Sequence, residues 1–302
     1  MFRRAMEFAG SWYPHSAAGC LEQMRRWEEE PFPERGSGVA LPARFCVTPH
    51  AGWMYSGRLA CRAVQAMAGK TGGAAPDMSV RLVVLLGGHL RRDDPVIAMT
   101  EGEWATPFGP FPIHEGFAPH LDGLPSVVRE SQARHEPDNS IEVPLPFLRR
   151  AFPQAELLPL RVPPTEVAIE LGARLAQYLA ATGLPAVAAA STDLTHYGPN
   201  YGFEPRGRGI AAERWVREEN DPLFIQALAG GSSRDILDTA RRQRNACCPG
   251  ATAALNEIVR AAAGSARTFR PLGYATSLDA GRESRPAADS ANFVGYVAGV
   301  YA

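Results

Sequence analysis

The sequence lacks the features expected of a membrane protein, a nucleic-acid-binding protein or a disulfide-stabilised secreted protein. No apolar run approaches the ~18 residues that a membrane helix needs, and residues 1–8 lack the apolar core of a signal peptide. The 31 basic and 32 acidic side chains give a formal net charge of −1, which predicts no broad basic field for nucleic acid or anionic membrane. Five cysteines, an odd number, argue against a disulfide framework. We therefore expect a cytoplasmic protein that acts on a small molecule.

Several catalytic motifs are also absent. The chain has no Walker loop, no Gly-x-Gly-x-x-Gly after a strand, no Gly-x-Ser-x-Gly elbow and no Cys-x-x-Cys pair. No repeat at solenoid periods is visible, and no low-complexity linker divides the chain. We expect residues 1–302 to form a single domain.

Short apolar strands alternate with amphipathic helices along the chain, a pattern typical of an α/β fold. It predicts a central, mostly parallel or mixed sheet flanked by helices, with the last two strands added antiparallel at an edge. The expected strands are 43–49, 81–86, 185–191, 268–277 and 292–301. The expected helices include 56–67, capped by Ser56, then 163–182, 233–241, 251–263 and one that Asp221 caps before Pro222. Glycine- and proline-containing segments at 36–38, 69–77 and 279–290 are expected to be loops.

Three of these strands run into a histidine. The first leads to His50, the second to His89 after Gly87-Gly88, and the third to His196. In an α/β sheet, ligands bind beyond the carboxyl ends of the strands, so these imidazoles are candidates for a metal or acid/base site. The alternative for each one alone is a hydrogen-bonded histidine in a turn. His15, His114 and His120 lie in loop-like contexts and are interpreted as surface or structural residues.

A pair of adjacent cysteines, Cys247-Cys248, precedes a predicted helix start. A thiolate there is stabilised by the oriented N–H groups and can serve as nucleophile or ligand. The alternative is that one or both are small buried apolar residues. Because adjacent side chains rarely point the same way, we expect only one of them to face a site. Cys20, Cys46 and Cys61 are expected in the core.

Two further polar segments are candidates for the same site. Asp193 and His196 are three residues apart after a strand and fit a general base with its orienting partner, or support for a metal ligand. The alternative is a capping aspartate and a surface histidine. Asn139 and Glu142 belong to a polar segment before an apolar run, where two prolines predict a short or kinked helix. We expect Glu142 either to reach the site or to interact with the helix dipole as a first-turn carboxylate.

Taken in order, the motifs of the chain resemble the Memo family over nearly its whole length. The segments that carry the resemblance are Ala9-Gly10-Ser11-Trp12-Tyr13-Pro14, Pro49-His50-Ala51-Gly52-Trp53-Met54-Tyr55-Ser56-Gly57, Thr106-Pro107-Phe108-Gly109, Asn139-Ser140-Ile141-Glu142-Val143-Pro144, Ser191-Thr192-Asp193-Leu194-Thr195-His196-Tyr197-Gly198 and Tyr274-Ala275-Thr276-Ser277. The chain departs from the family pattern in three places. It has Gly87-Gly88 before His89, Asp138-Asn139 where the family has Glu-His, and Cys248 where the family has glycine after the cysteine.

The resemblance implies a fold like that of class III extradiol dioxygenases and a metal site of His50, His89 and Cys247. It also implies pocket roles for Asp193 and His196, the latter as an acid/base histidine. Two histidines and one anionic ligand leave positions open for O₂ and a chelating substrate. Because a thiolate can bind iron, copper and zinc, all three are candidate ions, and we favour Fe(II). Trp53, Tyr55, Tyr197, Asn139 and Glu142 are then expected to bind substrate.

Three classes of function remain open on the sequence, and one of them is a hydrolytic zinc enzyme, which would bind zinc and a water without any dependence on O₂. The other two are as follows. The first is a metal-dependent, dioxygenase-like redox enzyme acting on a small aromatic or other chelating substrate. The second is a non-catalytic protein that binds a metal or a peptide. Bacterial members of the family often occur with a radical enzyme and a third small protein, so the resemblance implies such partners, and a homo-oligomer is left open.

Overall fold

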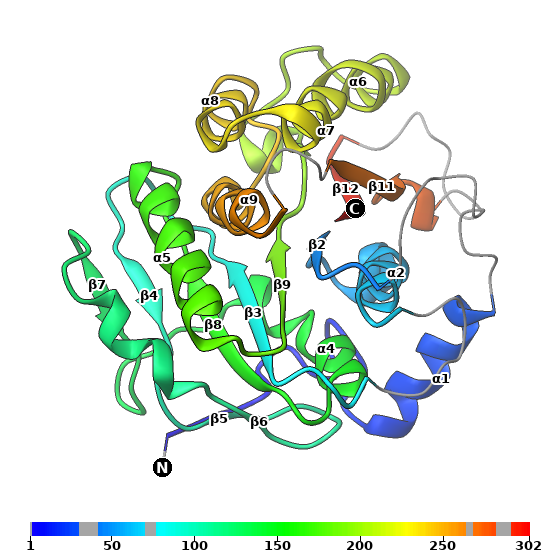
Figure 1. Cartoon of the computed structure of the whole chain (residues 1–302). Helices are drawn as coiled ribbons and strands as arrows, with labels where there is room; N and C mark the ends of the chain where they lie inside the picture. Colours follow the sequence, from blue (N-terminus) through cyan, green and yellow to red (C-terminus); the bar gives the residue numbers. More distant parts are fainter. Residues whose placement is uncertain (1, 30–41, 70–76, 264–267, 282–290) are drawn as a thin grey trace.

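A mixed β-sheet forms the centre of the protein (Figure 1). The computed structural model describes residues 2–29, 42–69, 77–263, 268–281 and 291–302. The main sheet has the order β10-β12-β2-β9-β3-β8-β4-β7, with β11 paired to β12. Its strands are β2 (Phe45–Thr48), β3 (Leu82–Gly87), β4 (Val96–Ala98), β7 (Val127–Arg129), β8 (Glu156–Arg161), β9 (Ala186–Ser191), β10 (His196–Tyr197), β11 (Phe269–Thr276) and β12 (Phe293–Tyr301).

The directions of the strands confirm the expected α/β class. Strands β2, β9, β3 and β8 run parallel, while β4 is antiparallel to β8 and β12 is antiparallel to β2. Strand β11 pairs antiparallel with β12 along its length and forms the edge, which confirms the antiparallel addition. A small second sheet joins β1 (Arg3–Arg4), β5 (Glu103–Trp104) and β6 (Phe111–Pro112).

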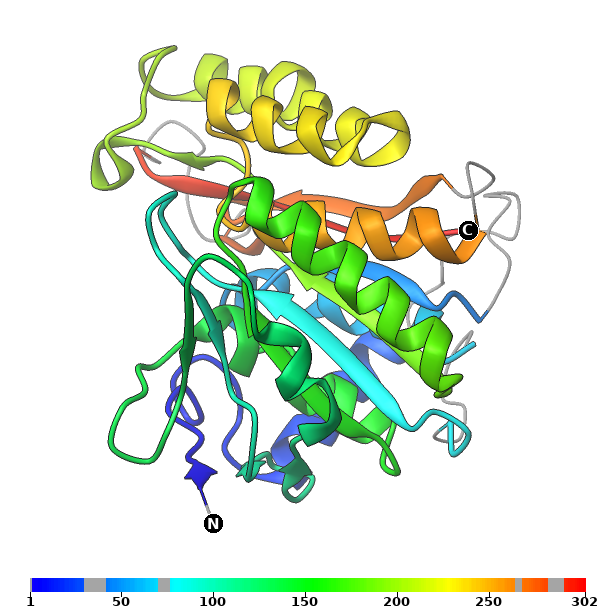
Figure 2. The same ribbon diagram turned by 60° about the vertical axis from the view of Figure 1, so that its left-hand side comes forward.

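Helices cover both faces of the main sheet (Figures 1 and 2). They are α1 (Ala17–Glu28), α2 (Arg58–Met67), α3 (Asn139–Glu142), α4 (Leu145–Ala151), α5 (Glu166–Thr182), α6 (Ile210–Trp215), α7 (Asp221–Gly230), α8 (Ser233–Gln243) and α9 (Pro249–Ala263). Within β3, Leu82, Val84 and Leu86 pack with α5 and α9, whereas Val83 and Leu85 pack with α2 and α4. Burial on both faces explains why this strand is a continuous apolar run. Helices α6, α7 and α8 form a further layer outside α9 and β11 (Figure 2).

Local signals set most helix boundaries. Thr165 caps α5 by accepting a hydrogen bond from the Val167 N–H, and Gly183 ends it in the left-handed region at φ 62°. The short pair α3 and α4 confirms the helix interrupted by prolines.

Two expected caps are wrong. The helix expected to start at Ser56 begins earlier, as a π-helical turn over Trp53–Gly57 that continues into α2. Asp221 caps nothing, because a second π-helical turn, Val216–Asn220, runs directly into α7. The side chain of Asp221 is instead buried.

The carboxyl ends of β2, β3 and β9 and the amino end of α9 meet at one edge of the sheet. This edge carries the histidines and the cysteine pair. No helix among the described residues is long and apolar enough to cross a membrane. The expected loop at 36–38 and most of those at 69–77 and 279–290 lie outside the described residues.

Candidate metal centre

His50 leaves the end of β2 fully buried, and its environment fixes the orientation of the ring. Its Nδ1 lies 2.8 Å from the Ser191 hydroxyl at the end of β9, and its backbone N–H donates to Asp193 Oδ1 over 2.9 Å. Both partners belong to the neighbouring parallel strand and the loop after it. Because Nδ1 is engaged, only Nε2 is directed into the centre.

His89 follows β3 through two glycines, and the close packing of this loop explains both. Gly88 has φ +103°, and a Cβ there would lie 2.6 Å from Cβ of Arg161. A Cβ on Gly87 would lie 2.6 Å from the Ser140 hydroxyl, which accepts a hydrogen bond from the Gly88 N–H. The loop delivers His89 Nε2 to 3.1 Å from Nε2 of His50, while its side chain stays exposed.

Cys247 is held by the loop that follows β9. Its N–H donates to the Asp193 carbonyl over 3.1 Å, and its sulfur accepts the Asp193 N–H over 3.2 Å. The Cys247 Sγ lies 3.3 Å from His50 Nε2. The structure thus brings together the three residues that the resemblance implies as ligands.

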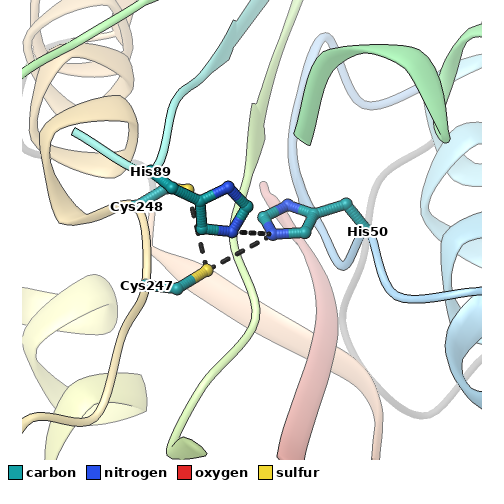
Figure 3. A group of neighbouring side chains, drawn as sticks. All are labelled: His50, His89, Cys247 and Cys248. Atoms are coloured by element: carbon teal, nitrogen blue, oxygen red, sulfur yellow. Dashed lines mark hydrogen bonds between the residues drawn. The ribbon is translucent and has the colours of Figure 1, made fainter. Parts of the chain in front are cut away.

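Cys248 points to the same centre. Its N–H donates to Thr192 Oγ1 over 3.1 Å, and its Sγ lies 3.6 Å from the Cys247 sulfur. Figure 3 shows both sulfur atoms beside the two imidazoles, and the four donor atoms lie within 4.8 Å of one another. The expectation that only one of the two cysteines faces the site is therefore wrong. Cys20, Cys46 and Cys61 are buried, as expected.

The cluster favours an ionised Cys247. Burial alone would raise the pKa of Cys247, but contact with the Cys248 sulfur and electrostatic interaction with the imidazoles of His50 and His89 hold it well below its usual value. Burial likewise opposes a charged His89, but the Cys247 thiolate raises the pKa of His89 to about 9. Burial raises the pKa of Cys248 well above its usual value, and the adjacent Cys247 adds to the effect.

Asp193 supports His50 in this structure. Its carboxylate accepts the His50 N–H and approaches His50 Nε2 at 3.9 Å, while burial raises its pKa. No hydrogen bond among the described residues joins the carboxylate of Asp193 to His196. The expectation that Asp193 orients the His196 ring is therefore corrected to support of His50.

His196 lies in β10, with its ring edge-on to Tyr201 at 4.9 Å between centroids. Its Nε2 is buried and has no hydrogen-bond partner among the described residues. Burial opposes its charged form, but the Cys247 thiolate raises the pKa of His196. An orphaned buried imidazole nitrogen beside the cluster is a ready proton carrier.

Asp221 holds the loop that carries His196, a role that sequence reasoning missed. Its buried carboxylate accepts the Thr195 N–H over 3.1 Å, the Thr195 hydroxyl over 2.5 Å and the Tyr274 hydroxyl over 2.7 Å. Burial raises the pKa of Asp221 to about 6. The Asp-Pro sequence resembled a helix cap and hid this contact. Ser191 and Thr192, also missed, were detectable as the polar residues that end the apolar strand β9.

Two of the expected pocket aromatics lie in the core. Trp53 is 2% exposed, stacks on Phe147 at 4.3 Å and donates its indole N–H to the Val143 carbonyl. Tyr197 is fully buried and donates its hydroxyl to the Gly207 carbonyl. The expectation that these two line a pocket is corrected. Tyr55 is 44% exposed and remains available to a ligand.

Asn139 lies beside the centre, whereas Glu142 does not. The Asn139 amide donates to the His50 carbonyl over 3.3 Å, so it lies beside the centre. Glu142 is fully buried and accepts the Phe8 N–H over 2.8 Å and the Tyr13 hydroxyl over 2.8 Å. Its role is to anchor the N-terminal segment, which corrects its assignment as a substrate residue.

The donor set fits a transition metal. With metal–nitrogen bonds of about 2.0–2.1 Å and metal–sulfur bonds of about 2.3 Å, tetrahedral ligands stand about 3.3 Å apart for two nitrogens and about 3.6 Å for nitrogen and sulfur. The two Nε2 atoms are 3.1 Å apart, and His50 Nε2 and Cys247 Sγ are 3.3 Å apart. Imidazole and thiolate are ligands that Fe(II), Cu(I) and Zn(II) accept.

Fold and site define the class as an α/β protein with a His/Cys cluster beyond the carboxyl ends of its parallel strands. The chain belongs to the Memo family, since the sequence model of that family, described as "Memo-like protein", matches residues 4–300. A MEMO1 family protein of Pyrococcus horikoshii is 27% identical over 288 residues, covering 93% of this chain and 94% of the relative. One of Methanopyrus kandleri is 30% identical over 308 residues, covering 99% and 98%.

Among solved structures, an uncharacterized protein of Escherichia coli K12 matches with a TM-score of 0.44 and 15% identity. The match covers 78% of this chain and 91% of that one.

Proposed function

We propose that this protein is a metal-dependent redox enzyme in which His50, His89 and Cys247 hold the ion. The observation that carries the proposal is the convergence of two imidazole Nε2 atoms and a low-pKa sulfur on one point. Each of the three atoms can donate a lone pair, so one cation bound between them would satisfy all three. We favour Fe(II), with copper and zinc as alternatives.

We further propose a dioxygenase-like reaction on a small aromatic or other chelating substrate. A bound Fe(II) would supply open positions for O₂ and substrate and would let electrons pass from the substrate, which is oxidised, to O₂, which is reduced. Within the chain, His196 would carry the proton at Nε2, because that atom has no other partner among the described residues. Asp193 holds the His50 loop in place, and we assign substrate contact to Tyr55, which is exposed, and to Asn139, which lies beside His50.

The experiment is metal analysis followed by oxygen uptake. Protein purified without oxygen is analysed for bound metal, loaded with Fe(II), and mixed with catechols and aminophenols in an oxygen electrode. We expect one metal ion per chain and substrate-dependent O₂ consumption, both lost in His50→Ala. His196→Gln is expected to retain the metal and lose turnover. A protein that binds no metal, or that binds it without any O₂ uptake across the substrates, contradicts the enzyme proposal.

The alternative is a non-catalytic protein that binds a metal or a peptide. It is favoured by an exposed apolar surface next to the His50 loop, where Trp12 is 37%, Met54 69% and Tyr55 44% exposed. Trp12 belongs there because its carbonyl accepts the Trp53 N–H over 2.8 Å. Binding of a partner that Trp12→Ala abolishes, without any turnover, supports this reading.

The same proposal places the protein in the cytoplasm. The odd number of cysteines, five, and the 3.6 Å between the sulfur atoms of Cys247 and Cys248, too long for a disulfide bond, support a reducing compartment. A radical-enzyme partner, as the family resemblance implies, is tested by co-purification from the native host.

A further inference from the structure

The sulfur of the second cysteine lies within 4.8 Å of each of the other three donor atoms. Two thiolates bound tetrahedrally to one ion stand about 3.8 Å apart when each metal–sulfur bond is about 2.3 Å. The sulfur atoms of Cys247 and Cys248 are 3.6 Å apart. The nitrogen–nitrogen and nitrogen–sulfur separations, 3.1 Å and 3.3 Å, are short of their tetrahedral values by a similar amount. All three separations would reach tetrahedral values by a small expansion around one ion.

The backbone around the pair explains how adjacent side chains point the same way. The Cys247 N–H is bound to the Asp193 carbonyl, and the Cys248 N–H is bound to the Thr192 hydroxyl. Two consecutive residues after β9 therefore clamp two consecutive residues before α9. This pairing fixes both peptide planes and turns both sulfur atoms toward the imidazoles, as Figure 3 shows.

The start of α9 favours negative charge at this point. Its 15 residues begin at Pro249, directly after the pair, so the two cysteines adjoin the positive end of the helix dipole. The start of the helix is also held in place, because a Cβ on Gly250 would lie 2.3 Å from the Val162 carbonyl oxygen. A rigid helix end adjoining two convergent thiols suits a site with two anionic ligands.

We propose that Cys248 is a metal ligand, so that the resting centre is a four-coordinate site of His50, His89, Cys247 and Cys248. The inference rests on the proposed metal site and deepens it. A second thiolate makes the donor set softer and favours ions that accept tetrahedral sulfur and nitrogen, Fe(II) and Zn(II) among them. The competing role of Cys248 is that of a small apolar residue, since it is 1% exposed and packs against the core between the sheet and α9.

The test counts sulfur ligands directly. The full chain is loaded anaerobically with Co²⁺, whose thiolate charge-transfer absorption grows with the number of bound thiolates, and with Zn²⁺ for X-ray absorption at the zinc edge. We expect two sulfur ligands in the wild type and one in Cys248→Ala, with half the charge-transfer intensity. The dissociation constant for Zn²⁺ is expected to rise by about tenfold or more, as loss of a partner to a metal site typically causes.

Two matched variants control the test. Cys46→Ala removes a buried free thiol from β2 outside the cluster and is expected to leave two sulfur ligands and the full intensity. Cys248→Ser preserves volume if the alanine variant folds poorly, and the wild-type sulfur count decides the question without any variant. Circular dichroism checks each fold.

The outcomes separate this inference from the proposed function. A wild-type protein with one sulfur ligand, or a Cys248→Ala variant with unchanged intensity, overturns the role of Cys248 and leaves the three-ligand site standing. A folded wild type that binds neither Co²⁺ nor Zn²⁺ overturns both. Two sulfur ligands without O₂ uptake support Cys248 as a ligand and contradict only the enzyme.

Discussion

Histidines that lie beyond the carboxyl ends and beyond the amino ends of the parallel strands have opposite environments. At the carboxyl edge, Nε2 of His50 and Nε2 of His89 face each other at 3.1 Å. At the other edge, near the start of β8, His114 has its Nδ1 2.5 Å from a carboxylate oxygen of Glu156 and its Nε2 2.6 Å from the Tyr178 hydroxyl. Both nitrogens of His114 are satisfied by complementary partners within the chain.

This difference in hydrogen-bond partners shows that the fold explains the position of His114 but not the pairing of His50 with His89. A carboxylate and a hydroxyl can satisfy both nitrogens of one ring, so His114 is complete as a structural residue. Two facing imidazole nitrogens can share at most one proton, and a thiolate at 3.3 Å adds a negative charge. Burial alone does not distinguish His114 from His50, because both side chains are largely enclosed. The partners of their ring nitrogens distinguish them.

The largest contrast is expected from removing one histidine at each edge. His50→Ala should raise the dissociation constant for Zn²⁺ or Fe(II) by about 100-fold or more, because it deletes a direct donor. His114→Ala should leave it unchanged. Competition with a chromophoric chelator measures both. An equal loss of metal affinity in the two variants would contradict the different roles given to His50 and His114.

The next effect concerns the turn that carries His89. Gly88→Ala is expected to lower the free energy of unfolding by about 2–3 kcal/mol, because φ is +103° and the new Cβ meets Arg161. Metal affinity should fall with it, since the loop that places His89 must shift. Gly183→Ala is the control. It has φ +62° with no atom within 4 Å, so it should cost about 1 kcal/mol and leave affinity intact. Urea unfolding and chelator competition report the two quantities.

A smaller effect is expected from the pH dependence of Asp221, the buried carboxylate behind His196. Its pKa is about 6 in the folded protein against 3.8 for an ordinary aspartate, so the folded state binds the proton more tightly than the unfolded state. Raising the pH from about 4 to 7 should therefore lower the free energy of unfolding, by on the order of 2 kcal/mol. Asp221→Asn should remove this component. Urea titrations at several pH values give the free energy of unfolding as a function of pH. If it changes with pH equally in the wild type and in Asp221→Asn, the assignment to Asp221 is contradicted.

The smallest effect is expected at the satisfied edge. Tyr178→Phe removes the hydrogen bond to His114 Nε2 and should cost about 1 kcal/mol of stability. Metal content should not change. Thermal unfolding and elemental analysis on the same sample make the measurement. A loss of metal in this variant would mean that the two edges are coupled.

Much of the fold was predictable because the signals are local. The apolar runs of β2, β3 and β9 identify strands buried on both faces, and Thr165 and Gly183 mark the ends of α5. The edge at which His50, His89 and His196 gather follows from the parallel direction of those strands. The π-helical turns before α2 and α7 were not predictable, since cap signals cannot reveal a helix that is already running.

The predictions for the site failed where tertiary contacts decide orientation. The sequence alone cannot tell that Trp53 turns into the core while Tyr55, two residues later, stays exposed. Nor does it reveal that Thr192 holds the backbone of Cys248, and so the direction of its sulfur. Asp221 and Glu142 bind segments distant in sequence, and neither contact has a local signature.

The unequal exposure of His50 and His89 would have a kinetic consequence at the proposed metal centre. His50 is fully buried, whereas His89 is open to solvent. An ion arriving from solution would meet the His89 imidazole first and reach His50 last, and a chelator would have to detach His89 before any other donor. The rates of loading and release should therefore depend on His89, whereas the lifetime of the loaded centre should depend on the buried donors behind it.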